Sequence, residues 1–352
     1  MNFASEITVW YRRNQRKLPW RNTQDPYRIW LSEIIMQQTR VEQGLNYYNK
    51  FVETFPTVAD LANAHDDVVM KLWQGLGYYS RARNLHYTAK QIVKNYGGIF
   101  PNEFKEIRAL KGIGDYTASA IASFAFNKPY AVVDGNVMRV ITRIFGITEP
   151  IDKSNARKKI NKIAEELLPH ENPGLYNQAI MEFGAIQCKP ANPLCEECCM
   201  NKICFAFENK MVSGIPFKTK KNAAKKRHLN YLIISLHKGK AIYLYINKRT
   251  GNDIWKNLYD FPSIETNEMQ EPAVLIQSRQ WKSIFNNKKY VITKVSDIFK
   301  HQLTHQTIYA RFYEISIKSP LTIHDPKIIL VDENDLKEYA IPRLIDKYLQ
   351  LR

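Results

Sequence analysis

Two acidic residues stand where a carboxyl group could take part in chemistry. Glu33 lies in the expected helix 27–36, with apolar residues on both sides of it in the sequence. A carboxyl group in such a segment lies either at a solvated edge or half buried with a raised pKa. Asp134 precedes an expected helix start, where an acidic side chain is an ordinary N-cap. If it faces a bound nucleic acid it could also do chemistry, and the sequence leaves both alternatives open.

A second group of chemically active residues is the cysteines, all of which lie between residues 188 and 204. Clustering this tight does not suit the disulfides of a secreted protein and indicates a metal or cluster site in a reducing compartment. The spacing Cys188-x6-Cys195-x2-Cys198-x5-Cys204 lets four thiolates converge on one small inorganic centre. Zinc is the structural alternative, although its common pattern is two separated Cys-x2-Cys pairs. Cys199 could replace Cys198 only by changing the spacing on both sides, so we expect it not to be a ligand.

The charge and length of the chain limit the kinds of partner and architecture. The formal net charge of +17 over 352 residues favours a polyanionic partner, nucleic acid first, with a basic protein lacking such a partner as the alternative. The length predicts two domains, each with its own core. No apolar run reaches the roughly eighteen residues of a membrane span, and the N-terminus lacks a signal-peptide core. We expect no membrane contact and a bacterial, cytoplasmic, nucleoid-associated location.

The elements that must position these residues are mostly helices. In the stretch 103–144, two apolar helical patterns flank a turn in which Gly112 and Gly114 allow a sharp bend and close approach to another molecule. The helix expected from Asp115 points free N–H groups outward, which attracts phosphate. The loop 75–83 combines glycines, tyrosines and arginines that suit base stacking and phosphate binding, with ordinary loop packing of Tyr79 as an equal alternative. No βαβ alternation appears in this half, which excludes a doubly wound nucleotide fold.

The last third of the chain has a different pattern. From His228 the apolar period changes from 3.6 to 2, and we expect strands at 231–236, 241–247, 291–298 and 308–317. The basic run 216–227 precedes them as a linker. It either lies along a phosphate backbone or is a solvated tether.

The Gly-Ile-Gly turn at 112–114, followed by Val-Asp-Gly-Asn-Val at 133–137, resembles the helix–hairpin–helix DNA glycosylase superfamily. Within it, the chain looks like the adenine DNA glycosylase (MutY) branch over nearly its whole length. The resemblance implies an α+β fold class: an all-helical helix–hairpin–helix glycosylase region with a [4Fe–4S] loop, followed by a Nudix-like α/β C-terminal domain. The domains would be a catalytic region 1–215, with the hairpin at about 103–128 and the cluster loop at 188–204, a basic linker 216–227, and a lesion-recognition domain 228–352. The resemblance also implies that the [4Fe–4S] ligands are Cys188, Cys195, Cys198 and Cys204.

The C-terminal domain carries its own motifs. Residues 254–262 resemble the Trp-x-x-Leu-Trp/Tyr-(Asp/Glu)-Phe-Pro segment of the family's second domain, which is similar to Nudix pyrophosphohydrolases. The Arg-Glu-x-x-Glu-Glu core of those enzymes is absent after residue 262, so we interpret this domain as a recognition module without a Mg²⁺ site. Phe299, Lys300 and His301 occupy the place of the family's Phe-Ser-His loop, which senses 8-oxoguanine. Lys300 departs from the usual serine, and His305 is a second candidate.

The resemblance gives the two carboxyl groups distinct roles. Glu33 would be the general acid that protonates adenine at N7, and Asp134 the carboxylate that stabilises positive charge on the sugar or bonds to C1′. The target base must be flipped out of the duplex before it can be reached. The family pattern adds supporting positions: Tyr116 and Asn136 hold the carboxyl groups, Arg21 lies near the adenine, and Gln38 and Tyr78 fill the base stack.

Tyr116 separates this interpretation from its nearest rival. The endonuclease III family has a nucleophilic lysine at that place, whose amine forms a Schiff base with the sugar and cuts the strand, and tyrosine cannot do this. We therefore predict a monofunctional, monomeric glycosylase acting on double-stranded DNA with adenine opposite 8-oxoguanine or guanine. A third hypothesis is a non-enzymatic DNA-binding protein with a cluster, which predicts that Glu33→Gln leaves function intact.

Overall fold

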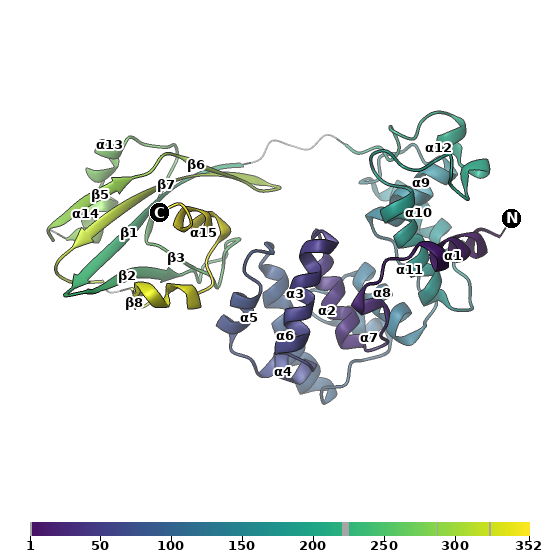
Figure 1. The fold of residues 1–352 in the computed structure, drawn as a ribbon, viewed down its shortest axis with the longest axis horizontal. Helices are drawn as coiled ribbons and strands as arrows, with labels where there is room; N and C mark the ends of the chain where they lie inside the picture. The colour runs from purple at the N-terminus through teal and green to yellow at the C-terminus, as the bar shows by residue number, and fades with distance from the viewer. Residues whose placement is uncertain (1, 220–224, 287, 324) are drawn as a thin grey trace. The chain divides into compact units, whose positions relative to one another are not determined.

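The computed structural model describes residues 2–219, 225–286, 288–323 and 325–352. The chain forms two compact units, Met1–Asn63 with Asn84–Lys221 and Ala64–Arg83 with Asn222–Arg352 (Figure 1). The segment 64–83 therefore packs with the C-terminal residues, although helices of the first unit precede and follow it in the chain. No helix in the described ranges is long and apolar enough to cross a membrane.

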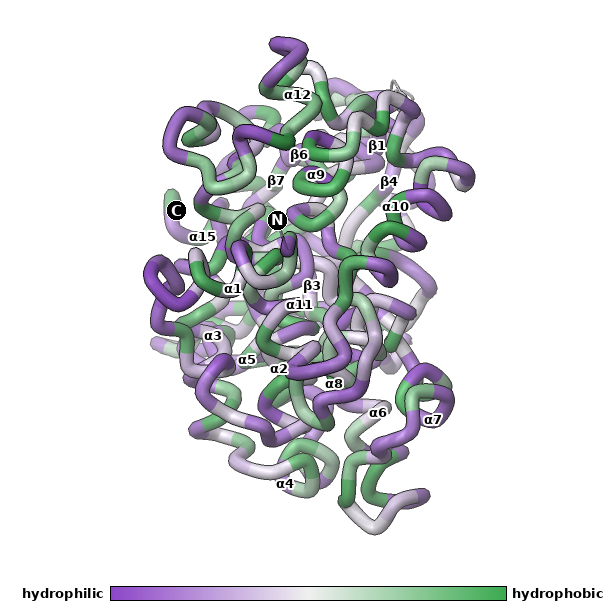
Figure 2. Tube along the Cα trace, turned by 90° about the vertical axis from the view of Figure 1, so that its right-hand side faces the viewer, coloured by the Kyte–Doolittle hydropathy of each residue, from purple (hydrophilic) through white to green (hydrophobic). Residues whose placement is uncertain are grey.

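Helices build the N-terminal half of the chain, as the fold class predicts. Their core buries apolar side chains that recur at helical spacing, among them Ile7 of α1, Val140 of α9 and Ile160 of α10. Hydrophobic and hydrophilic residues alternate along the traces of these helices (Figure 2). The helical elements are α1 (Phe3–Asn14), η1 (Pro19–Arg21), α2 (Pro26–Met36), α3 (Val41–Thr54), α4 (Val58–Asn63), α5 (Asp66–Leu72), α6 (Ser80–Tyr96), α7 (Phe104–Ala109), α8 (Asp115–Phe126), α9 (Gly135–Phe145), α10 (Ser154–Glu166), α11 (Pro173–Glu182), η2 (Phe183–Gln187), η3 (Asn201–Ile203) and α12 (Phe205–Glu208).

The second unit contains, over the described part of the chain, a sheet of eight strands. Its main path runs β3-β2-β1-β7-β5, while β4 pairs with β1, β6 with β7 and β8 with β2. The long central pair, β1 and β7, is parallel, and β6 runs antiparallel to β7. The elements are β1 (Lys225–Lys238), β2 (Ala241–Lys248), β3 (Tyr259–Asp260), β4 (Ser263–Thr266), α13 (Pro272–Ile276), α14 (Arg279–Phe285), β5 (Tyr290–Val295), β6 (Phe299–Gln302), β7 (Gln306–Ile317), β8 (Ile328–Asp332), η4 (Glu333–Glu338) and α15 (Arg343–Leu349).

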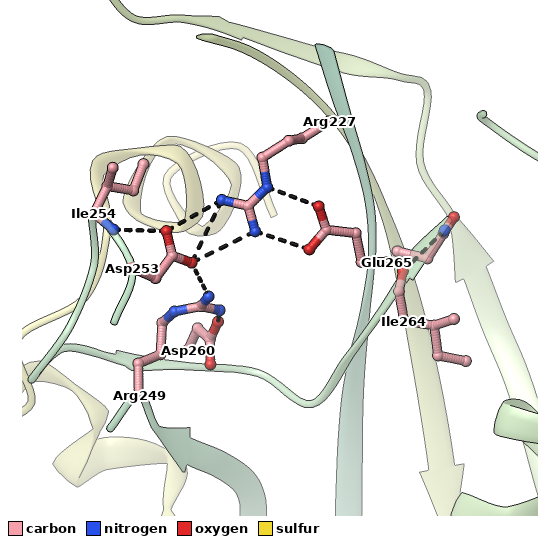
Figure 3. A network of polar contacts seen from close by, with 8 residues as sticks. Arg227, Arg249, Asp253, Ile254, Asp260, Ile264 and Glu265 are labelled. Atoms are coloured by element: carbon pink, nitrogen blue, oxygen red, sulfur yellow. Dashed lines mark hydrogen bonds and ion pairs between the residues drawn. The ribbon is translucent and has the colours of Figure 1, made fainter. Parts of the chain in front are cut away.

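The end of the expected linker has a structural role of its own. Strand β1 begins at Lys225, and Arg227 donates two hydrogen bonds to Glu265, of 2.7 and 2.8 Å (Figure 3). Arg227 also pairs with Asp253, which Arg249 contacts in turn. Arg227 thus ties β1 to β4 through ion pairs and belongs to the sheet, whereas the sequence predicted a linker residue that either lies along a phosphate backbone or is solvated. Lys220 and Lys221 of the same basic run lie outside the described residues.

Candidate active site

Glu33 and Tyr116 form a hydrogen-bonded pair on two packed helices. Helix α2 begins at Asp25, whose side chain accepts from the Tyr27 amide at 2.9 Å, and Pro26 occupies the first turn. Helix α2 packs against α8, which carries Tyr116 in its first turn. Tyr116 Oη donates to Glu33 Oε2 at 2.6 Å. The packing of these two largely buried helices thus brings together residues 83 positions apart in the chain.

The surroundings of Glu33 favour its protonated form. Burial raises the pKa of Glu33 to about 7, and the negative charge of Asp134 acts in the same direction. The hydrogen bond from Tyr116 and the charge of Arg21 oppose this rise. Burial also raises the pKa of Tyr116 well above its usual value, so its hydroxyl stays a donor. Of the two alternatives for Glu33, the structure shows the half-buried carboxyl group with a raised pKa.

Asp134 is the N-cap of α9, and its side chain also lines the site. Its Oδ1 accepts from the amides of Asn136 and Val137, at 2.8 and 2.7 Å, and its Oδ2 accepts from Asn136 Nδ2 at 2.7 Å. Burial raises the pKa of Asp134, while these hydrogen bonds and the charge of Arg139 lower it. Burial has the larger effect, so the pKa of Asp134 is raised overall, while three hydrogen bonds, against one for Glu33, favour its carboxylate form.

Arg139 connects the start of α9 to the segment that contains the cysteines. Its Nη2 donates to Asn136 Oδ1 at 2.9 Å and to Gly184 O at 2.6 Å, and its Nε donates to Cys188 O at 2.8 Å. A Cβ on Gly184 would come within 2.7 Å of Asn136 Cβ, so glycine permits this close packing. Arg139 is not among the residues predicted from the sequence. The sequence signal that could have found it is an arginine between two apolar residues, Met138 and Val140.

Both carboxyl groups line one pocket of about 380 Å³ in the first unit. Gln38 lines it too, as an exposed residue with a φ of 56°. The predicted site residues that the structure brings together here are Arg21, Glu33, Gln38, Tyr116, Asp134 and Asn136.

Two further charged residues of the pocket, Arg16 and Glu182, are absent from the predicted set. The Glu182 side chain on α11 is 0% exposed and accepts hydrogen bonds from Arg16 and Arg21. Burial alone would raise the pKa of Glu182, but the bonds from the two arginines lower it to about 2. The signal in the sequence is the same as for Glu33, an acidic residue between apolar neighbours, here Met181 and Phe183.

Gly112 and Gly114 shape the hairpin between α7 and α8 in different ways. Gly112 has a φ of 80°, and a Cβ there would lie 2.7 Å from Asn84 Cβ. Gly114 is the N-cap of α8 with an ordinary φ of −91°, and an added Cβ would meet no atom within 4 Å. Gly112 therefore makes the turn, while Gly114 leaves open space at the N-terminus of α8.

Tyr78, Phe299 and His301 belong to the second unit. Tyr78 has a φ of 47° and is 42% exposed, and its hydroxyl shares a 2.7 Å hydrogen bond with Thr304 Oγ1. Phe299 and His301 lie on one face of β6, both half buried, and Lys300 between them is exposed. Burial lowers the pKa of His301, and nearby positive charges lower it further, so its imidazole is neutral near pH 7.

Four cysteines of the 188–204 segment line one cavity of about 20 Å³, and Cys199 does not. All five are free, and Arg143 Nη1 donates to Cys188 Sγ at 3.4 Å. Across the described ranges, no three His, Cys, Asp or Glu side chains surround a point that could hold one metal ion. Cys188, Cys195, Cys198 and Cys204 line the same cavity, and four thiolates are the ligand set of an iron–sulfur cluster.

Comparisons with known proteins agree with this architecture. Residues 31–168 match the HhH-GPD superfamily base excision DNA repair protein family, and residues 230–351 match the NUDIX domain family. A solved thermostable thymine-DNA glycosylase is 33% identical, with a TM-score of 0.54 over 59% of this chain and 95% of that structure. An endonuclease III–DNA complex aligns with a TM-score of 0.52 over 59% of this chain and 94% of that structure; its 22% identity shows the fold alone. The protein is thus a DNA glycosylase of the helix–hairpin–helix superfamily.

Similarity over the full length of the chain shows to which family of DNA glycosylases it belongs. The adenine DNA glycosylase of Buchnera aphidicola subsp. Baizongia pistaciae is 34% identical over 99% of this chain and 95% of the relative. The human adenine DNA glycosylase is 39% identical over 58% of this chain and 39% of that protein. The chain belongs to the adenine DNA glycosylase family, whose enzymes act in base excision repair.

Proposed function

We propose that this chain is a monofunctional glycosylase that hydrolyses the N-glycosidic bond of adenine paired with 8-oxoguanine or guanine in double-stranded DNA. The observation that carries the proposal is the pair of unlike carboxyl groups in one pocket. Glu33 has a pKa raised to about 7, and Asp134 accepts three hydrogen bonds that stabilise its charge. A flipped adenosine needs both, a proton donor for the base and a negative charge for the sugar.

In the first step, protonated Glu33 gives its proton to N7 of the flipped adenine, which makes the base a better leaving group. The hydrogen bond from Tyr116 to Glu33 Oε2 orients the carboxyl group and stabilises the carboxylate formed by the transfer. Because Tyr116 stays protonated, it serves as a donor throughout this step.

In the second step, the C1′–N9 bond breaks and positive charge grows on the deoxyribose. Asp134, fixed by Asn136 and the amide of Val137, supplies the compensating negative charge, or bonds transiently to C1′ as a glycosidase nucleophile does. Water then completes the hydrolysis and leaves an abasic site. Since Tyr116 has no amine to form a Schiff base, the strand is not cut.

The other predicted residues bind DNA in this proposal. Arg21 contacts the adenine, and the hairpin glycines allow the phosphate backbone to approach the N-terminus of α8. In the C-terminal domain, a neutral His301 and the adjacent Phe299 recognise the base opposite the adenine. The proposed DNA-binding residues are Arg21, Gln38, Tyr78, Gly112, Gly114, Phe299 and His301.

We also propose that Cys188, Cys195, Cys198 and Cys204 hold a [4Fe–4S] cluster. The four cysteines would hold the cluster, which would supply four bonds that fix the 188–204 segment, and we propose that Lys189 of this segment lies near DNA. The hydrogen bond from Arg139 to Cys188 O supports a structural role, because it joins this segment to the start of α9.

The proposed domains are a catalytic region 1–215, a linker 216–227 whose last three residues enter β1, and a lesion-recognition domain 228–352. The NUDIX match over residues 230–351 supports the last boundary. We propose that the protein acts as a monomer on DNA of the bacterial nucleoid.

The experiment that tests this function uses duplexes with adenine opposite 8-oxoguanine or guanine, treated with alkali after incubation. Wild type should yield alkali-dependent cleavage at the adenine, and Glu33→Gln should bind the duplex without releasing adenine. If the protein were a non-enzymatic DNA-binding protein, wild type and Glu33→Gln would bind the duplex equally and neither would release adenine. A high yield of borohydride-stable protein–DNA adduct would contradict the monofunctional assignment.

A further inference from the structure

A group of three charges, of which only Glu182 is fully buried, lines the pocket of the proposed acid and takes no part in the proton transfer or bond cleavage above. Arg16, Arg21 and Glu182 line the same pocket as Glu33. Arg16 precedes η1 and Arg21 ends it, while Glu182 is the last residue of α11. Arg16 and Glu182 are 166 positions apart in the chain, so only the tertiary fold brings them together.

Glu182 is held more tightly than a surface carboxylate would be. Its Oε1 accepts from Arg16 N at 2.9 Å and from Arg16 Nε at 2.8 Å. Its Oε2 accepts from Arg16 Nη2 at 2.6 Å and from Arg21 Nη2 at 2.7 Å. Arg21 also donates from Nη1 to Arg16 O at 3.2 Å, which closes the group into a ring of contacts. With its side chain 0% exposed, Glu182 is a charge that the solvent screens little.

We propose that Glu182 is a positioning residue that holds Arg16 and Arg21 at the pocket and offsets their charge, so that Glu33 stays protonated at the pH of catalysis. This inference rests on the proposed function, since it assigns a role relative to the acid of that reaction. Glu182 itself does not touch the reacting atoms in this proposal and acts through the two arginines.

The direction of the effect follows from the charges around Glu33. The titratable and charged groups that line the pocket with Glu33 are Tyr116 from α8, Asp134 at the start of α9, and the three charges Arg16, Arg21 and Glu182. The charge of Arg21 lowers the pKa of Glu33. Together the three charges carry one net positive charge. Neutralising Glu182 would leave two, and the carboxylate form of Glu33 would become more favourable.

Neutralising Arg16 has the opposite consequence, because Glu182 and Arg21 then balance each other. The pocket beside Glu33 loses its net positive charge, and the protonated form becomes more favourable. A role of Glu182 limited to holding the fold together predicts no such opposite pair of effects. It predicts only a lower rate at every pH.

The test is the pH profile of the single-turnover rate of adenine release, whose fall at high pH reports the ionisation of Glu33 in the complex. Glu182→Gln should move this fall to lower pH by about one unit, and Arg16→Gln should move it to higher pH. The double variant Arg16→Gln with Glu182→Gln should return it close to wild type, because the net charge is restored.

The outcomes separate this inference from the proposed function. If wild type releases no adenine, the proposed function fails. If wild type is active and the profiles of both single variants coincide with it except in height, the positioning role is overturned. Should Glu182→Gln fail to fold, as judged by its thermal unfolding, Arg16→Gln decides alone: an upward shift supports the inference, and an unchanged profile overturns it.

Discussion

At the scale of single residues, two carboxyl groups of the pocket differ because the protein provides different partners for them. Glu33 accepts one hydrogen bond, from a tyrosine hydroxyl, and burial outweighs that bond. Asp134 accepts from two backbone amides at a helix start and from an amide side chain, where the helix dipole also favours negative charge. Burial raises the pKa of both groups, but the hydrogen bonds favour the carboxylate form of Asp134 more than that of Glu33.

The burial of Glu33 lowers the free energy of unfolding by an amount that depends on pH. Its pKa rises from an ordinary 4.5 to about 7 in the folded protein, so between these values the folded state binds more protons than the unfolded state. Stability therefore falls as pH rises through this window. We expect Glu33→Gln to stabilise the protein by about 3 kcal/mol at pH 8 and by much less at pH 4.5.

Urea unfolding of the wild type and of Glu33→Gln at the two pH values measures this difference. The matched control is Glu53→Gln, which changes an exposed glutamate on α3 and should alter stability little at either pH. If Glu33→Gln were less stable than wild type at pH 8, burial of the Glu33 carboxyl group would not lower the stability of the protein.

At the scale of elements, the hairpin between α7 and α8 offers two glycines with different requirements. Gly112→Ala would place a side chain at a φ of 80° and its Cβ 2.7 Å from Asn84 Cβ, so we expect a loss of about 1–2 kcal/mol. Gly114→Ala has an ordinary φ and open space for its Cβ, so the fold should keep its stability.

Thermal unfolding and DNA affinity together check this pair. Gly112→Ala should lower both. Gly114→Ala should keep the wild-type unfolding temperature and lose DNA affinity only if the phosphate backbone approaches α8 closely. Equal unfolding temperatures for wild type and Gly112→Ala would contradict the turn geometry.

The elements themselves were accessible from the sequence because their signals are local. Periodic apolar residues predicted the helix that carries Glu33 and the main strands, which the structure confirms. The contacts of Glu182 with Arg16 were not accessible, because they join residues 166 positions apart. For Arg227, basic neighbours suggested a linker, whereas pairing of β1 with β4 sets Glu265 beside it.

The packing of segment 64–83 could not be predicted for the same reason. Its helical pattern is local, but its partners are not: Lys248 Nζ donates to Asp67 Oδ1 at 2.9 Å, and Arg83 Nη1 donates to Lys256 O at 2.8 Å. These contacts place α5 and the following loop in the unit that contains the sheet. The helical pattern therefore identifies an element without identifying the unit to which it belongs.

At the scale of the whole molecule, two of the proposed DNA-binding regions lie in one unit, because segment 64–83 groups with the sheet. Tyr78, which is proposed to enter the base stack, lies in the same unit as Phe299 and His301 on β6. Thr304, the partner of the Tyr78 hydroxyl, lies in the turn that joins β6 to β7. The position of Tyr78 is thus tied to the strand proposed to recognise the opposite base.

The bond between Tyr78 and Thr304 should therefore affect lesion preference. Thr304→Val and Tyr78→Phe each remove it while keeping the side-chain shape, and we expect each to lower the ratio of adenine release opposite 8-oxoguanine to that opposite guanine by about two- to tenfold. Because both changes delete one shared interaction, the double variant should lose no more than either alone. Single-turnover rates on the two duplexes measure the ratio, with Thr250→Val, at an exposed position of the same unit, as the control. Additive losses would mean that the two side chains act on DNA independently.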